Sequence, residues 1–201
     1  MRLIERLDAV CDRRNILRHP FYRRWEAGSL TRGELAFYAG EYRHAVCALA
    51  ELAETASLGE HAEEEAAHVE LWDAFARELG ADLDRAPRAE TAACVHAWTT
   101  PADELEGLAA LYAIESTQPA VARTKLDGLV SHYGFKPDAP AAEYFALHAE
   151  RDVEHADQSR ALLESRANER DAGRLVAAAD RVLEGNWRLL DGVERRSQER
   201  I

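Results

Sequence analysis

Residues 141–166 read AAEYFALHAERDVEHADQSRALLESR, a stretch that contains neither glycine nor proline. Alanine, leucine, glutamate and arginine make up much of it, and these residues have high helix propensity. The same residue types recur throughout the chain, whereas runs of β-branched residues, which favour strands, are almost absent. The sequence therefore predicts an all-α protein, and we expect Ala141–Arg166 to form one long helix.

Start and stop signals divide the rest of the chain into further helices. Thr31 and Glu34 match a capping box, and Asp103 is placed to cap another helix. Pro119 should kink or divide the helix that Asp103 begins, and Gly134 should end it. We expect helices at about Leu3–Arg13, Pro20–Ala27, Thr31–Ser57, Glu60–Leu79, Arg88–Trp98, Asp103–Tyr133, Ala141–Arg166 and Glu169–Arg195. Residues 1–201 are interpreted as a single domain in which neighbouring antiparallel helices form a bundle.

Composition and charge narrow the possible partners. The chain is 47% hydrophobic and 31% charged, an ordinary globular balance, and its net charge of -12 would repel a phosphate backbone. No signal-peptide core and no long apolar run are present. Cys11, Cys47 and Cys94 are odd in number and widely spaced, which suits a reducing compartment. We expect a cytoplasmic protein with no nucleic-acid and no membrane partner.

Two segments share a histidine spacing. Residues 61–68 read HAEEEAAH and residues 148–155 read HAERDVEH. In each segment a carboxylate follows the first histidine by four residues, and a second histidine follows the carboxylate by three. At about 100° per residue, these offsets fall within an arc of about 60° on one helix face. Two imidazoles and one carboxylate therefore share a face in each segment: His61, Glu65 and His68, and His148, Asp152 and His155.

This combination of side chains predicts a metal site. Imidazole nitrogen and carboxylate oxygen are ligands that suit iron and manganese. Glu65 and His68 also form the Glu-x-x-His step that carboxylate-bridged dimetal bundles use. Glu115 lies in the apolar segment LYAIEST, where a carboxylate is costly unless it meets a cation or a proton. A solvated helix face is the alternative for either histidine segment, and Glu63 or Glu64 could substitute for Glu65.

Several segments together resemble a known family. They are HPFYRRWEAGSLTRGELAFYAGEY (19–42), LYAIESTQPAVARTKLDGL (111–129), HYGF (132–135) and HAERDVEH. They resemble the heme-oxygenase-like dimetal oxidases, a superfamily that also contains the TenA and PqqC proteins. Within it they are most similar to the CADD-like branch, the death-domain-associating proteins that form para-aminobenzoate. The resemblance covers about residues 10–195.

The resemblance implies a fold, a cofactor and site residues. It implies a seven-helix bundle that holds a buried pair of metals, Fe/Fe or Fe/Mn, for O2 activation rather than heme binding, and it implies a homodimer. The residues on the family's ligand positions are His68, Glu115, His148, Asp152 and His155. Tyr22 and Lys125 fall where the CADD-like branch consumes a tyrosine side chain and uses a lysine as amino donor, and Tyr38 and Tyr42 match nearby aromatic positions.

Two positions depart from the family's pattern. The family places a glutamate seven residues before the first-segment histidine, and that position is His61 here. It also places a tyrosine before the ligand glutamate, and that position is Ile114. The metal site could therefore use Glu65 in place of the missing glutamate, use His61, or hold only one ion firmly.

We interpret the chain as a non-heme dimetal oxidase that takes O2 as co-substrate and electrons from an external donor. Its substrate would be a small organic molecule or its own Tyr22. One alternative is a metal-free enzyme of cofactor biosynthesis, similar to PqqC or TenA, in which Cys47 would be the nucleophile. Another is a protein-interaction module without catalytic activity.

Overall fold

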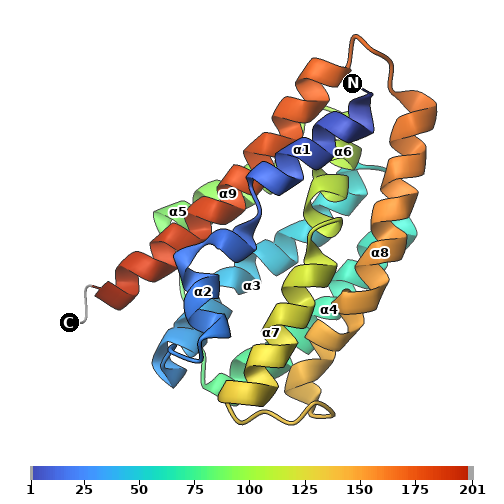
Figure 1. Cartoon of the computed structure of the whole chain (residues 1–201). Helices are drawn as coiled ribbons and strands as arrows, with labels where there is room; N and C mark the ends of the chain where they lie inside the picture. Colours follow the sequence, from blue (N-terminus) through green and yellow to red (C-terminus); the bar gives the residue numbers. More distant parts are fainter. Residues whose placement is uncertain (1, 199–201) are drawn as a thin grey trace.

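A computed structural model describes residues 2–198, and within them the chain forms only helices (Figure 1). In order they are α1 (Leu3–Arg13), the 3-10 helix η1 (Ile16–Arg18), α2 (Pro20–Glu26), α3 (Arg32–Thr55), α4 (Gly59–Leu79), α5 (Ala89–Thr99), α6 (Glu104–Glu115), α7 (Gln118–His132), α8 (Pro140–Arg166) and α9 (Ala172–Gln198). The prediction of an all-α protein is confirmed.

The predicted start and stop signals act as expected. Thr31 Oγ1 accepts a hydrogen bond from the Glu34 amide at 3.2 Å, and the Glu34 carboxylate accepts one from the Thr31 amide at 2.7 Å. The Asp103 side chain caps α6 by accepting from the Glu106 amide at 3.0 Å. With Pro119 in the first turn of α7, the chain breaks between α6 and α7. This break leaves Glu115 in the last turn of α6.

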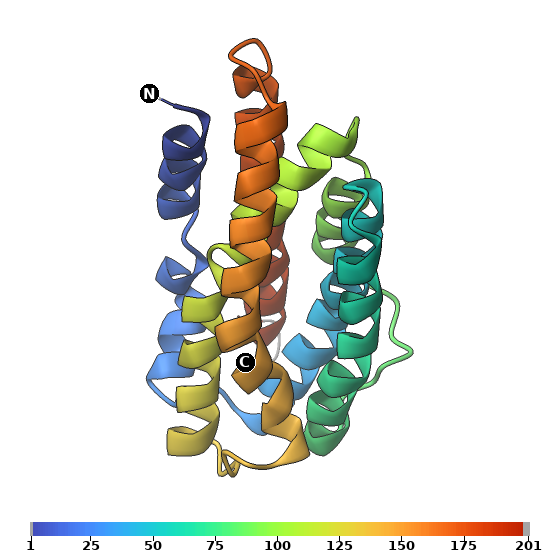
Figure 2. The same ribbon diagram turned by 90° about the vertical axis from the view of Figure 1, so that its right-hand side faces the viewer.

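The helices pack as an elongated bundle (Figures 1 and 2). The long helix α8 contacts α4, α6 and α7, while α3 contacts α4 and α5. The last helix, α9, packs against α1, α5 and α6. The described residues form nine α-helices rather than the seven that the resemblance implied, because α2 is short and α6 and α7 are separate segments. None of these helices is both long and apolar enough to cross a membrane.

Buried tryptophans fix the distances between helices in the core. Trp25 and Trp72 are fully buried, and each finds a partner for its indole N–H. Trp25 donates to the Lys125 carbonyl at 3.1 Å, which joins α2 to α7, and Trp72 donates to the Ala39 carbonyl at 2.8 Å, which joins α4 to α3. The Trp25 ring lies so close to Gly128 that a Cβ there would meet it at 2.5 Å. Glycine at 128 therefore allows α2 and α7 to approach.

Candidate metal centre

All the predicted ligand side chains are buried in the interior between α4, α6 and α8. The most exposed of them, His68, is only 9% exposed. The residues are His61, Glu65 and His68 on α4, Glu115 on α6, and His148, Asp152 and His155 on α8. The alternative of a solvated helix face is therefore wrong for both histidine segments.

Glu65 lies in the middle of this group. Its Oε1 is 3.2 Å from His68 Nδ1 and 3.8 Å from both His61 Nε2 and His155 Nδ1. Its Oε2 is 3.7 Å from His148 Nε2. Burial raises the pKa of the Glu65 carboxyl, but the contacts with His148 and His68 outweigh burial and hold that pKa well below its usual range. Glu65 is therefore an ionised carboxylate surrounded by imidazoles from two helices.

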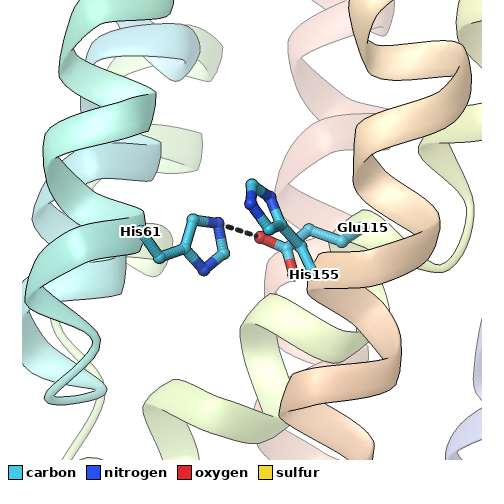
Figure 3. Close-up of side chains that lie close together, drawn as sticks. All are labelled: His61, Glu115 and His155. Carbon is cyan, nitrogen blue, oxygen red and sulfur yellow. Dashed lines mark ion pairs between the residues drawn. The ribbon is translucent and has the colours of Figure 1, made fainter.

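Glu115 joins the group from the end of α6. Its Oε1 lies 2.8 Å from His61 Nε2. Figure 3 shows His61 reaching from α4 towards Glu115 and His155 on the opposite side. The His61 and His155 rings face each other with centroids 3.7 Å apart. One ligand atom from each of these residues lies within 4.8 Å of the others, so the trio offers a compact donor set.

Two further trios of candidate ligands lie beside the first one, and one of them shares His155 with it. They are Glu65, His68 and His148, and Glu65, Asp152 and His155, again with ligand atoms within 4.8 Å of one another. Because Glu65 and His155 each belong to two trios, the groups form one continuous set of donors. Three carboxylates and four imidazoles are enough to ligate two metal ions through oxygen and nitrogen.

Several polar atoms of this set lack hydrogen-bond partners among the described residues. Both ring nitrogens of His61 and both carboxylate oxygens of Glu115 and Asp152 are buried without a hydrogen bond of good geometry, as are His148 Nε2 and His155 Nδ1. His61 Nε2 and Glu115 Oε1 are close enough for an ion pair, but their orientation does not form a hydrogen bond. Buried polar groups without partners are costly, and burial raises the pKa of Glu115 and Asp152 well above the usual range. A metal cation would satisfy these atoms and stabilise the charged carboxylates, so the residues fit the predicted metals.

His148 has a partner that the sequence did not identify. Its Nδ1–H donates to the Tyr144 carbonyl at 2.7 Å, which leaves Nε2 facing Glu65. The Tyr144 ring also stacks on the imidazole, with centroids 3.9 Å apart. Tyr144 lies four residues before His148 on the predicted helix, and this spacing is the only sequence signal that places it there.

The other predicted site residues gather beside the metal-ligand candidates. Tyr22, Tyr38, Tyr42 and Lys125 come from α2, α3 and α7, and each is at most 2% exposed. The Tyr22 and Tyr38 hydroxyl oxygens are 3.3 Å apart. Lys125 Nζ lies 4.6 Å from the Tyr42 ring centroid and 5.8 Å from that of Tyr22. Burial lowers the pKa of Lys125 to about 7. The amine therefore lies in an aromatic cage and is partly neutral near pH 7.

Trp72 and Tyr144 connect the aromatic cage to the metal-ligand candidates. The Trp72 ring centroid lies 5.3 Å from that of Tyr42 and 4.9 Å from that of Tyr144, which stacks on His148. Both residues are buried and neither was a sequence candidate for the site. Contacts between neighbouring rings therefore form a continuous series from Tyr42 to the candidate ligand His148.

Replacing Lys125 with methionine should stabilise the fold in a pH-dependent way. Between pH 7 and the ordinary lysine pKa of 10.5, the unfolded wild-type chain binds more protons than the folded chain, so wild-type stability rises with pH. From pH 7 to pH 9, the free energy of unfolding of the wild type should rise by about 2 kcal/mol relative to the Lys125→Met variant. Urea denaturation at both pH values measures this difference. An equal gap between the proteins at both pH values would show that the amine is not shifted.

Cys47, the nucleophile of the metal-free alternative, is poorly suited to that role. Burial raises the pKa of its thiol, and the nearby Arg43 only partly opposes this effect. Raising the pKa reduces the fraction of reactive thiolate at neutral pH. Cys47 also lies on the half-buried face of α3 rather than among the buried histidines.

Comparisons with known proteins agree with this architecture. A TenA homologue from P. horikoshii superimposes with a TM-score of 0.78 over 97% of this chain and 99% of its own, at 18% identity. A domain of unknown function with a heme oxygenase-like fold from Shewanella denitrificans gives a TM-score of 0.77 over 98% and 92% of the two chains, at 19% identity. The protein therefore has the predicted heme-oxygenase-like fold.

Sequence comparison identifies the family. The model of a family of iron-containing redox enzymes matches residues 43–187, and the chain belongs to this family. The 4-aminobenzoate synthase of Chlamydia muridarum is 31% identical over 95% of this chain and 89% of its own length. The predictions of an oxidoreductase, of iron as its metal and of a relationship to the CADD-like, 4-aminobenzoate-forming branch are confirmed.

Proposed function

We propose that this chain forms 4-aminobenzoate from its own Tyr22, with Lys125 as the source of the amino nitrogen and O2 as the oxidant. The observation that carries the proposal is the buried Lys125 amine, 5.8 Å from the centroid of the Tyr22 ring, in a protein whose interior also holds imidazoles and carboxylates with unsatisfied polar atoms. The similarity to the 4-aminobenzoate synthase of Chlamydia muridarum supports the same activity. An external electron donor would reduce the metals, and we expect the chain to act as a cytoplasmic homodimer.

The metals would be held by the buried donor set. His61, Glu115 and His155 would ligate one ion, and Glu65, His68 and His148 the other. Asp152, whose carboxylate lies close to Glu65 and His155, would complete the set. Bound iron, as Fe/Fe or Fe/Mn, would supply the redox chemistry that O2 activation requires. The carboxylates balance the charge of the cations, and Tyr144 keeps His148 oriented through the bond to its Nδ1.

The side chains of the aromatic cage would prepare the reacting groups. Burial holds the pKa of Tyr22 well above its usual value, so the phenol keeps its proton until it reacts. The Tyr38 hydroxyl oxygen, 3.3 Å away, is placed to accept that proton. Because the pKa of Lys125 is about 7, part of the amine population has a free lone pair at neutral pH. Burial of all these groups also excludes water from the reacting atoms.

Metal removal tests this proposal directly. Protein reconstituted anaerobically with iron(II) and then exposed to O2 and a reductant should release 4-aminobenzoate, up to a single molecule per chain. Chelator-treated protein should release none, because its own side chains cannot oxidise the phenol. Liquid chromatography with mass spectrometry measures the product. Equal yields with and without metal would contradict the proposal.

A second candidate is an oxidase that turns over an external small organic substrate. The observation that favours it is Ile114, which is fully buried and replaces the phenol that the family places beside the ligand glutamate. A multiple-turnover enzyme would consume more than one O2-dependent equivalent of substrate per chain while its own mass stays unchanged. Intact-protein mass spectrometry after the reaction distinguishes the two candidates.

A further inference from the structure

A carboxylate outside the ligand set contacts one of the candidate ligands. Glu64 on α4 directly precedes Glu65, but its side chain is 39% exposed and lies on the outer side of His155. Its Oε2 is 3.1 Å from His155 Nε2. The other ring nitrogen, His155 Nδ1, lies 3.8 Å from Glu65 Oε1 and has no hydrogen bond among the described residues. The imidazole therefore spans from an outer carboxylate to an inner one.

Arg151 holds this outer carboxylate from the neighbouring helix. Its Nε donates to Glu64 Oε2 at 3.0 Å and its terminal nitrogen donates to Oε1 at 2.7 Å. This two-point contact joins α8 to α4 and orients the Glu64 carboxylate. Glu64 therefore contacts His155 with a carboxylate that Arg151 orients from the neighbouring helix.

The direction of the hydrogen bond determines which nitrogen of His155 can bind a metal. An ionised carboxylate only accepts, so His155 Nε2 must carry the proton in its bond to Glu64. In a neutral imidazole the lone pair then lies on the other nitrogen, Nδ1, which lies 3.8 Å from Glu65 Oε1. A hydrogen bond from the non-ligating nitrogen to a carboxylate also makes the ligating nitrogen more basic.

We propose that Glu64 is a positioning residue of the metal centre: it selects Nδ1 of His155 as the ligand atom, and Arg151 holds Glu64 for this purpose. The inference rests on the proposed metal-binding function. It adds a role for a residue that the sequence offered only as a substitute for Glu65. Loss of such an outer partner typically lowers metal affinity by about 10- to 100-fold.

Iron affinity of the apo-protein tests the inference without relying on activity. Iron(II) is titrated anaerobically into the apo forms of the wild type, Glu64→Ala and Glu64→Gln in competition with a chromogenic chelator. We expect Glu64→Ala to bind about 10- to 100-fold more weakly. Glu64→Gln should fall between Glu64→Ala and the wild type, because its amide oxygen can still accept from His155 Nε2. The absorption spectrum of the cobalt(II)-loaded protein should differ from that of the wild type more in Glu64→Ala than in Glu64→Gln.

Glu154→Ala is the matched control. Glu154 lies on α8, is 70% exposed and forms a salt bridge with the same Arg151, but Glu64 rather than Glu154 contacts His155. This variant should bind iron(II) within about twofold of the wild type. Alanine has a higher helix propensity than glutamate, so we expect each variant to fold. Thermal unfolding of each apo-protein checks that the fold is intact.

The outcomes separate the two proposals. Iron binding equally tight in Glu64→Ala and Glu154→Ala would overturn the positioning role of Glu64 while leaving the metal site in place. A wild type that binds no iron(II) would overturn the metal-binding function, and the role of Glu64 with it.

Discussion

Replacing Glu65 with glutamine is expected to lower iron(II) affinity by about 100-fold or more, a larger loss than for any outer partner. Among the carboxylates that the structure describes, only Glu65 has oxygens within 4 Å of all four candidate imidazoles. A neutral amide would remove the negative charge from the middle of the donor set. It would also replace one oxygen ligand by an NH2 group, which cannot bind a cation.

Glu63→Gln is the control for this prediction, because Glu63 is exposed and precedes Glu65 by two residues on the same helix. Metal analysis after reconstitution, together with circular dichroism of the apo-proteins, separates a binding defect from a folding defect. Wild-type iron content in a folded Glu65→Gln protein would show that Glu65 is not a ligand.

Replacing Tyr22 with phenylalanine is expected to lower the yield of 4-aminobenzoate by at least about 100-fold. The amount of bound iron should stay the same. The substitution keeps the ring and most of the volume in a fully buried position, so the core should remain packed. It removes the hydroxyl that contacts Tyr38, and with it the phenol that would be oxidised. Product yield per chain and iron content are measured on the same sample.

Tyr133→Phe is the control variant. Tyr133 directly follows α7, and its hydroxyl donates to the Trp25 carbonyl and accepts from the Leu30 amide, so it does not contact Tyr22 or Tyr38 through a hydrogen bond. It should keep wild-type yields. Wild-type protein grown with ring-labelled tyrosine should release labelled product in unlabelled buffer. Unlabelled product, or full activity in Tyr22→Phe, would contradict self-consumption and favour an external substrate.

The structure explains how His61 can stand where the family pattern has a glutamate. Positions 61 and 65 lie four residues apart on α4 and therefore face the same direction. A carboxylate at position 65, about one helical turn after position 61, therefore points into the same interior. Both residues are buried: His61 contacts Glu115, and Glu65 contacts His68. Two of the three possibilities that the sequence left open, Glu65 and His61, are therefore compatible, because the structure brings both side chains into the donor set.

The sequence by itself determined the helices and the faces of each helix. Capping residues such as Thr31 and Asp103 and the break at Pro119 are local signals that depend on a few neighbouring residues. The periodicity of the helix also decided that His148, Asp152 and His155 point the same way. Such relations within one element follow from 3.6 residues per turn and need no knowledge of the fold.

Only the tertiary structure decided which faces meet. The contact of Glu64 with His155 and the ring contacts of Trp72 with Tyr42 and Tyr144 join residues from different helices. Such contacts depend on how side-chain ridges and grooves pack and on where each helix crosses its neighbour, and no local pattern encodes these. Helix periodicity placed donors on single faces, and packing brought those faces into one buried set.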